Sequence, residues 1–358
     1  MSLKRWISAK TRFVDIDEPF ELETGESLPH VRIAYRTWGS PQPNATLVCH
    51  ALTGSADADD WWADLFGPGR ALDPERDFIV SANVLGGCYG TTGPTSRADG
   101  AFEPYGGSFP KVTIRDMVRL QALLLDRLGV ATLDLVIGGS MGGMQALEWP
   151  LLFPDRVRAI APIAVGAAQS AWGIALSEAQ RQAIKADANF AGSRYPLGAG
   201  PTQGLAAARS MAMISYRSPH NFEDRFGRGE DESGRYEVQS YLRYQGEKLV
   251  NRFDANTYLT LIDAMDSHDV SKGRASMDEA LHSIGQPALV VGVSSDGLYP
   301  ASEVAAMAAQ LPRAEFVEID APHGHDAFLI RVDEVNDLLV DFINRHNLKQ
   351  RLRLAVNE

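Results

Sequence analysis

One serine among four glycines constrains this sequence more than any other feature. The stretch VIGGSMGGM, residues 136–144, follows an apolar run and precedes the helix-like letters ALEW. Ser140, Gly138 and Gly142 form the pattern G-x-S-x-G, which is typical of a nucleophile elbow, a strand-to-helix turn so tight that its flanking residues must be small. The same letters also fit an ordinary turn in which a serine begins a helix. The stretch by itself leaves both interpretations open.

Length and composition exclude several classes of protein. With 358 residues, of which 45% are apolar and 22% charged, the chain can form a large core and is neither wholly disordered nor collagen-like. The net charge of −12 argues against a nucleic-acid-binding surface. No apolar run approaches the length that spans a bilayer, and MSLKRWISAKTRF lacks the apolar region of a signal peptide. We expect a cytoplasmic protein that binds neither nucleic acid nor membrane.

Cysteine usage points to thiols rather than disulfides or metal ligands. Cys49 and Cys88 are the two cysteines of the chain, which are too few for a disulfide scaffold. No Cys/His spacing resembles a zinc site. We expect two reduced, structural thiols and no bound metal.

Strand-like and helix-like segments alternate in the first and last parts of the chain. The predicted strands cover residues 31–38, 46–52, 77–87, 133–139, 157–165, 287–296 and 314–320, and the predicted helices cover 113–129, 141–153, 301–312 and 327–346. Many of these strands are apolar throughout instead of alternating, which is typical of a parallel sheet buried on both faces. The sequence therefore predicts an α/β fold with a mostly parallel central sheet.

The middle of the chain has a different character. Helical patterns occupy residues 170–187, 204–218, 236–253 and 257–266, and strand-like runs are absent there. We interpret residues 166–285 as a helical lid insertion. Residues 1–165 and 286–358 then form the first and second parts of one α/β core.

A serine nucleophile requires a base and an acid that orients the base. Asp296 directly follows the strand-like run PALVVGVSS, and His325 lies in the loop after the last predicted strand, so both follow Ser140 in the order serine, acid, histidine. Asp296 before a glycine is also an ordinary turn residue. His323, two residues earlier in the same loop, competes with His325 for the role of base.

The developing oxyanion would need two backbone N–H donors. Met141, directly after the nucleophile, supplies one, and Leu52 in the segment HALTG after an early strand is the best candidate for the other. His50 in the same segment reads as a structural histidine.

Several longer motifs extend this pattern over nearly the whole chain. They are HALTG (50–54), NVLGGCYGTTGP (83–94), FPKVTIRDM (109–117), GGSMGGMQALEW (138–149), FDANTY (253–258), SSDGLYP (294–300) and GHDAFL (324–329). With these motifs the sequence resembles the homoserine O-acetyltransferase family of α/β-hydrolase-fold acyltransferases. The resemblance implies Ser140 as nucleophile with Asp296 and His325 as its partners. It also implies transfer of the acetyl group of acetyl-CoA, a co-substrate rather than a cofactor, to L-homoserine, giving O-acetyl-L-homoserine for methionine biosynthesis.

The resemblance also suggests how the acceptor is held. It places the arginine that meets the homoserine carboxylate at Arg209, with Tyr216 nearby and Asp326 close to the ammonium group, and it suggests a homodimer formed through the lid helices. By themselves, Arg209 could be an exposed helix residue and Asp326 a helix cap. Succinyl transfer to homoserine or serine, an esterase and a non-enzymatic interaction protein remain alternatives.

Overall fold

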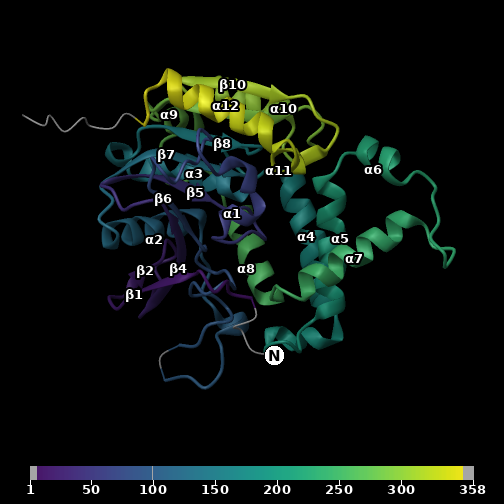
Figure 1. Cartoon of the computed structure of the whole chain (residues 1–358). Coiled ribbons are helices and arrows are strands. Elements are labelled where there is room, and N and C mark those ends of the chain that lie inside the picture. The colour runs from purple at the N-terminus through teal and green to yellow at the C-terminus, as the bar shows by residue number, and fades with distance from the viewer. Residues whose placement is uncertain (1–5, 99, 350–358) are drawn as a thin grey trace, which may run out of the picture.

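A computed structural model describes residues 6–98 and 100–349 (Figure 1). The ends of the predicted first and third segments, including part of the N-terminal stretch discussed above, lie outside these residues. Eight strands form one sheet in the order β1-β4-β6-β5-β7-β8-β9-β10. They are β1 (Arg12–Ile16), β4 (Val31–Trp38), β6 (Ile79–Ala82), β5 (Asn44–Cys49), β7 (Thr132–Gly139), β8 (Ile160–Ile163), β9 (Ala288–Val293) and β10 (Ala314–Ile319), while β2 (Phe20–Glu21) and β3 (Ser27–Leu28) pair separately.

The sheet is mostly parallel, as the apolar strands predicted. All pairs from β6 to β10 are parallel, and β1 and β4 are antiparallel to their neighbours. Every residue of β6, β8 and β9 is buried, which explains why these strands are apolar throughout. The predicted strand at 157–165 proves shorter, since only its central residues join the sheet.

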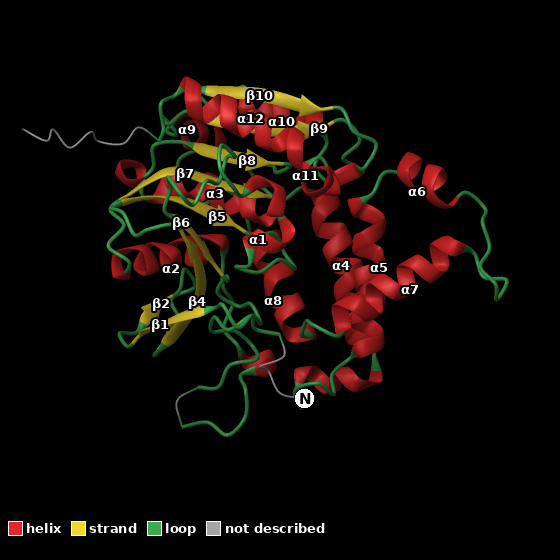
Figure 2. Cartoon of the chain, in the orientation of Figure 1, coloured by secondary structure: helices red, strands yellow, loops and turns green. Residues whose placement is uncertain are grey.

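Helices cover both faces of the sheet (Figure 2). Buried residues of α2 (Ile114–Arg127), α3 (Met141–Leu152) and α10 (Ala301–Ala308) belong to one apolar cluster. Buried residues of α1 (Ala58–Trp61) and α12 (Val332–Arg345) belong to a second cluster. The sheet therefore separates two cores, the layered arrangement of a buried parallel sheet.

Between β8 and β9 the chain forms helices. They are α4 (Ala171–Ala186), α5 (Thr202–Tyr216), α6 (Pro219–Phe226), α7 (Glu237–Val250), α8 (Ala255–Asp266) and α9 (Met277–His282). Helix α5 packs between α4 and α7, and these three helices stand beside the sheet on the side toward which the β10 arrow points (Figure 2). Among the described residues, no helix is both long and apolar enough to cross a membrane.

The prediction of one closing helix over 327–346 is wrong. The chain leaves the helical conformation at Arg331 (φ −91°, ψ 47°), which separates α11 (Ala327–Ile330) from α12. The carbonyl of Phe328 accepts a hydrogen bond of 3.0 Å from the indole Nε1 of Trp62. A distant tryptophan thus takes up a carbonyl that a continuous helix would use itself, and sequence periodicity does not reveal this contact.

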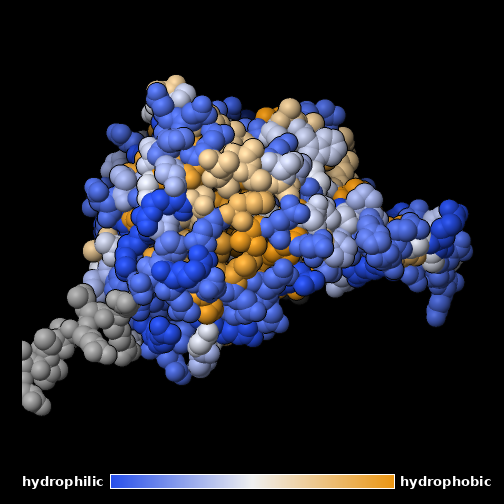
Figure 3. Space-filling view, turned by 90° about the horizontal axis from the view of Figure 1, so that it is seen from above, coloured by the Kyte–Doolittle hydropathy of each residue, from blue (hydrophilic) through white to orange (hydrophobic). Residues whose placement is uncertain are grey.

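Strand β10 forms one end of the sheet. Seen from its side, the molecule shows an apolar area in the middle of the surface, surrounded by hydrophilic residues (Figure 3). Phe316 of β10 is 37% exposed. Glu315, its neighbour, pairs with Arg345 and His346. Such charged residues protect an edge strand against pairing with another chain.

Candidate active site

Ser140 lies in the strained turn between β7 and α3. Its backbone has φ 56° and ψ −124°, a positive φ that residues other than glycine rarely adopt. Strand β7 ends at Gly139 and α3 begins at Met141, so the turn consists of Ser140 alone. This is the conformation that a nucleophile elbow requires, because it lifts the serine out of both the strand and the helix.

The glycines around Ser140 are needed because other atoms occupy the space that side chains would fill. A Cβ on Gly142 would overlap the carbonyl of Cys49 at the end of β5, and a Cβ on Gly138 would overlap the backbone of Gly142. A Cβ on Gly139 would lie 2.5 Å from the ring of Phe328. Contacts this short exclude any side chain unless the backbone moves. The four glycines let α3 approach β5 closely.

The ends of neighbouring strands bring Asp296 and His325 together. Gly139 is paired with Ile163 across β7 and β8, and Val293 with Ile319 across β9 and β10, so the loops that follow leave the sheet at the same edge. His325 Nδ1 lies 2.7 Å from Asp296 Oδ2, and both residues are buried. The other oxygen of Asp296 accepts hydrogen bonds from the backbone of Leu298 and Tyr299. Asp296 therefore orders its own turn and also binds the histidine.

The electrostatic surroundings of the two loop histidines differ. Burial lowers the pKa of His325, but the charge and hydrogen bond of Asp296 outweigh burial and raise this pKa above its ordinary value. Burial and two nearby arginines lower the pKa of His323, and its Nδ1 is a buried atom with no hydrogen-bond partner in the described structure. Of the two, His325 has the carboxylate partner that a catalytic base needs.

Aromatic rings surround His325. The rings of Tyr216, Tyr299 and Phe328 lie with their centroids 5.7, 5.4 and 5.7 Å from the imidazole. Phe328 is also the ring that fills the space beside Gly139. This ring therefore lies against both the elbow of Ser140 and the histidine, which links the two parts of the site.

The two predicted oxyanion donors are free to bind a ligand. Within residues 6–98 and 100–349, neither Leu52 N–H nor Met141 N–H makes a hydrogen bond. The preceding carbonyl, that of Ala51, accepts hydrogen bonds from His50 Nδ1 (2.8 Å) and Gly54 N–H (2.9 Å). Because the peptide is planar and trans, fixing this carbonyl also fixes the opposite direction of the Leu52 N–H.

His50 is the structural histidine that the sequence suggested. Its Nε2 accepts a hydrogen bond from Val84 N–H (3.2 Å), so Nδ1 carries the proton that Ala51 receives. Burial lowers the pKa of His50 to about 4, which keeps the ring neutral.

Arg252 contributes to the same region and was not identified from the sequence. Its Nη1 donates to the carbonyl of Thr53 (2.8 Å) and to the hydroxyl of Tyr89. Arg252 thus ties the segment after α7 to the loop of Leu52. Its position directly before the motif FDANTY was the available signal.

The three predicted acceptor residues lie near His325. Arg209 and Tyr216 lie on α5, with the guanidinium 5.6 Å from the centre of the tyrosine ring. Arg209 Nη1 is buried and has no hydrogen-bond partner in the described structure. Asp326 makes no capping hydrogen bond to α11; instead its carboxylate lies 3.2 Å from Arg217 Nε. Burial raises the pKa of Asp326, while Arg217, His325 and Arg209 oppose this change.

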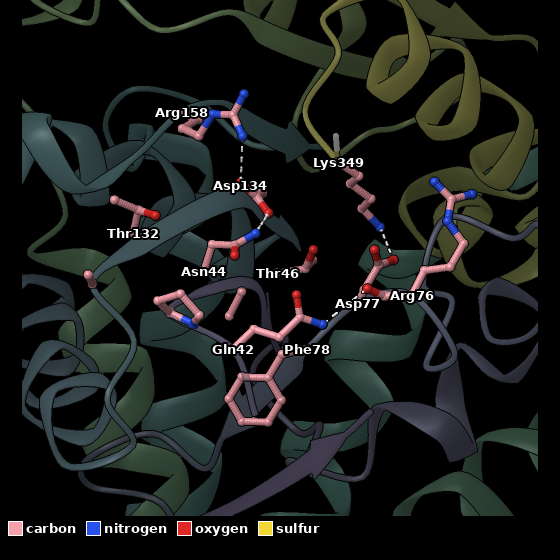
Figure 4. A pocket seen from close by; sticks show the side chains of 13 residues that line it. Gln42, Asn44, Thr46, Arg76, Asp77, Phe78, Thr132, Asp134, Arg158 and Lys349 are labelled. Atoms are coloured by element: carbon pink, nitrogen blue, oxygen red, sulfur yellow. Dashed lines mark hydrogen bonds and ion pairs between the residues drawn. The ribbon is translucent and has the colours of Figure 1, made fainter. Parts of the chain in front are cut away.

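A separate cavity of about 640 Å³ opens at the opposite ends of the strands, lined in part by Asn44 and Thr132, the first residues of β5 and β7 (Figure 4). It contains none of the predicted site residues. Its charged groups pair with one another, Arg158 with Asp134 and Lys349 with Asp77. The cavity therefore lacks an unpaired buried charge that would indicate a ligand.

The two cysteines are free and buried. Burial raises the pKa of both thiols, which disfavours the reactive thiolate. In residues 6–98 and 100–349 no group of three or more His, Cys, Asp or Glu side chains could hold a metal ion.

Comparisons with known proteins agree with this geometry. The family described as alpha/beta hydrolase fold matches residues 45–332. Homoserine O-acetyltransferases of Nostoc punctiforme and Chlorobaculum tepidum are 55% and 50% identical, covering 93% and 94% of this chain and 96% and 95% of those proteins. The crystal structure of esterase E22 matches with a TM-score of 0.85 at 26% identity, covering 93% of this chain and 99% of that one. The homoserine O-acetyltransferase structure from Bacillus anthracis has the same fold, with a TM-score of 0.87 at 24% identity and coverage of 94% and 98%. The chain therefore belongs to the homoserine O-acetyltransferase family of α/β-hydrolase-fold proteins.

Proposed function

We propose that this protein transfers the acetyl group of acetyl-CoA to the hydroxyl of L-homoserine through an acetyl-Ser140 intermediate. The observation that carries the proposal is the pair of opposite charges beside His325. Arg209 has a buried nitrogen without a partner, and Asp326 directly follows the histidine. An amino-acid acceptor carries one carboxylate and one ammonium group, so a fixed cation and a fixed anion match it.

In the first half-reaction Ser140 attacks the thioester carbonyl of acetyl-CoA. His325 takes the proton of the hydroxyl as the oxygen–carbon bond forms, and Asp296 stabilises the resulting imidazolium. The N–H groups of Leu52 and Met141 receive the oxyanion; removing one such donor typically reduces rate by about 10²–10³. The carbon–sulfur bond then breaks, and coenzyme A leaves as the thiol after taking the proton from His325.

In the second half-reaction the hydroxyl of homoserine replaces coenzyme A. His325 removes the hydroxyl proton, the acceptor oxygen attacks the acetyl-serine, and collapse of the tetrahedral intermediate releases O-acetyl-L-homoserine and restores Ser140. Water competes for the same intermediate. Positioning of the acceptor can supply roughly 7–11 kcal/mol of advantage, and the helices between β8 and β9, which carry Arg209 and Tyr216, would act as the lid that provides it.

Arg209 is the better candidate than Arg217 for the acceptor carboxylate. Arg217 already lies beside the Asp326 carboxylate. Arg209 instead has a free nitrogen held over Tyr216, and a guanidinium can bind a carboxylate through two parallel hydrogen bonds. The ammonium group of the acceptor would then lie toward Asp326, whose ionised form a second cation stabilises.

The remaining parts of the proposal concern the donor and the product. Acetyl-CoA serves as co-substrate, and the chemistry needs no cofactor because serine, histidine and backbone N–H groups supply all of it. The product would enter methionine biosynthesis. A cytoplasmic location agrees with acetyl-CoA as the donor.

We further propose a homodimer through the lid helices. Trp172 and Ile174 of α4, Ile214 of α5 and Tyr244 of α7 are large apolar side chains that are 41–59% exposed. Apolar groups on neighbouring helices are typical of a surface that a second copy covers. Sedimentation equilibrium should give twice the chain mass; a monomer at micromolar concentration would contradict this assembly.

The covalent intermediate provides the direct test of the reaction. Incubating the protein with radiolabelled acetyl-CoA and no acceptor should place one acetyl group per chain on Ser140, and adding homoserine should discharge it. Ser140→Ala should release no coenzyme A. Label on Cys49, on Cys88 or on no residue would rule out the two-stage scheme.

The pH dependence should report His325. Because the base must be neutral and its pKa is raised, the acylation rate should fall as the pH decreases through a value above the ordinary histidine pKa. Asp296→Asn removes the charge that raises this pKa, so the acidic limb of kcat/KM should move to lower pH while the rate decreases. In the control His323→Gln, both limb and rate should stay as in the unaltered protein. A limb that follows His323 would reassign the base.

Arg209 should separate a transferase from an esterase, the function of a solved relative of the same fold. Arg209→Ala should leave acetylation of Ser140 largely intact, because the donor does not use this contact. It should lower kcat/KM for homoserine by roughly 30-fold to several thousand-fold, which corresponds to about 2–5 kcal/mol for a partly desolvated charge pair. Arg243→Ala on exposed α7 is the matched control and should change neither step. Unchanged homoserine kinetics in Arg209→Ala would exclude this arginine and favour the esterase.

A further inference from the structure

A chain of buried side-chain amides runs beneath the elbow and has no part in the reaction described so far. Trp149 Nε1 donates to Gln121 Oε1 (2.9 Å), and Gln121 Nε2 donates to Gln145 Oε1 (2.7 Å). Gln145 Nε2 then donates to the carbonyls of Met141 (3.1 Å) and His50 (3.4 Å). All three side chains are buried, Gln145 and Trp149 completely. Buried amides are retained when every donor and acceptor is satisfied, as it is along this chain.

The direction of the chain is determined by its first member. An indole N–H can only donate, so Gln121 must present its oxygen to Trp149 and its nitrogen to Gln145. Gln145 must then present its oxygen to Gln121, which leaves its nitrogen for the two carbonyls. The orientation of the Gln145 amide is thus fixed by its partners, although oxygen and nitrogen of an amide are otherwise interchangeable in shape.

The two carbonyls that Gln145 holds belong to the two segments that carry the oxyanion donors. Met141 itself supplies one N–H, and His50 precedes by two residues the Leu52 that supplies the other. These segments are far apart in sequence, one at the end of β5 and one at the start of α3. A single carboxamide therefore bridges the two donors of the proposed oxyanion hole.

We propose that Gln145 is a positioning residue that sets the separation of the Leu52 and Met141 N–H groups. The inference rests on the proposed function, since it assigns a role toward the oxyanion of that reaction. Oxyanion donors act at 2.7–3.1 Å, so a small change in their separation weakens one of the two hydrogen bonds. Gln145 acts through these backbone groups and does not itself touch the substrate.

Gln145→Met tests the proposal, because it keeps the approximate volume and removes the two donated hydrogen bonds. Single-turnover acetylation of Ser140 should slow on the order of 10-fold, less than the 10²–10³-fold effect of losing a donor outright. A trifluoromethyl ketone carried on the sulfur of coenzyme A, which forms a tetrahedral oxyanion with Ser140, should lose affinity by the same factor. Affinity for coenzyme A itself should stay within about two-fold.

Asn336→Leu is the matched control. Asn336 on α12 is also buried, and its carboxamide oxygen accepts from the backbone of Ala71, outside the site. Both variants should lower the melting temperature, but Asn336→Leu should change neither the acetylation rate nor the affinity for the ketone. If Gln145→Met fails to fold, Gln145→Glu, which has nearly the same shape and turns an oxygen toward the two carbonyls, should show the same selective loss.

Two results would overturn the proposal. In one, Gln145→Met acetylates Ser140 at the rate of the unaltered protein. In the other, its affinities for the ketone and for coenzyme A decrease equally, which would indicate a purely structural role. Failure of the proposed function would look different, because the unaltered protein would then form no acetyl-Ser140 at all.

Discussion

The close approach of α3 to the end of β5 is the constraint on which the rest of the site depends. Gly142 leaves no room for a Cβ beside the carbonyl of Cys49. This contact places the first turn of α3 against the segment His50–Leu52, so that N–H groups from two distant parts of the chain can act on one oxygen. The strained φ of Ser140 is tolerated because the strand, the helix and the packed Phe328 ring hold it from three sides.

Around this backbone frame, buried charges are arranged in pairs with one informative exception. His325 is bound to Asp296 and Asp326 lies against Arg217, so these charges stabilise one another in a poorly solvated region. Arg209 reaches the same region with a buried nitrogen that has no partner. A buried donor without an acceptor is unfavourable in the empty protein, and a bound carboxylate would remove that penalty. The arrangement thus favours an anionic group on the acceptor.

The likeness to an esterase structure shows how little of the reaction depends on the fold itself. Serine, histidine and aspartate at the sheet edge can acylate the enzyme in either activity, and the difference lies in what deacylates it. The helices between β8 and β9 carry Arg209 and Tyr216, and they contact the loop of His325 through α5. Selection of the acceptor over water would therefore reside in these helices rather than in the strands.

The sequence by itself determined the elements that local pattern controls. Apolar runs identified the buried strands from β4 to β10, helical periodicity identified α2, α4, α5, α7 and α8, and glycine spacing identified the elbow at Ser140. Long motifs identified the family and indicated the candidate residues. These features are readable because they depend on the side-chain size and period of neighbouring residues.

Tertiary structure decided what depends on contacts between distant segments. The break at Arg331 occurs where the indole of Trp62 takes the Phe328 carbonyl, and periodicity cannot show that contact. The choice of His325 over His323 as partner of Asp296, and the unpaired nitrogen of Arg209, likewise arise from packing between elements. The role of Gln145 was hidden for the same reason, since its partners are two carbonyls and an amide from other parts of the chain. A hydrogen bond forms according to distance and direction in space, and one sequence fixes these only after the chain has folded.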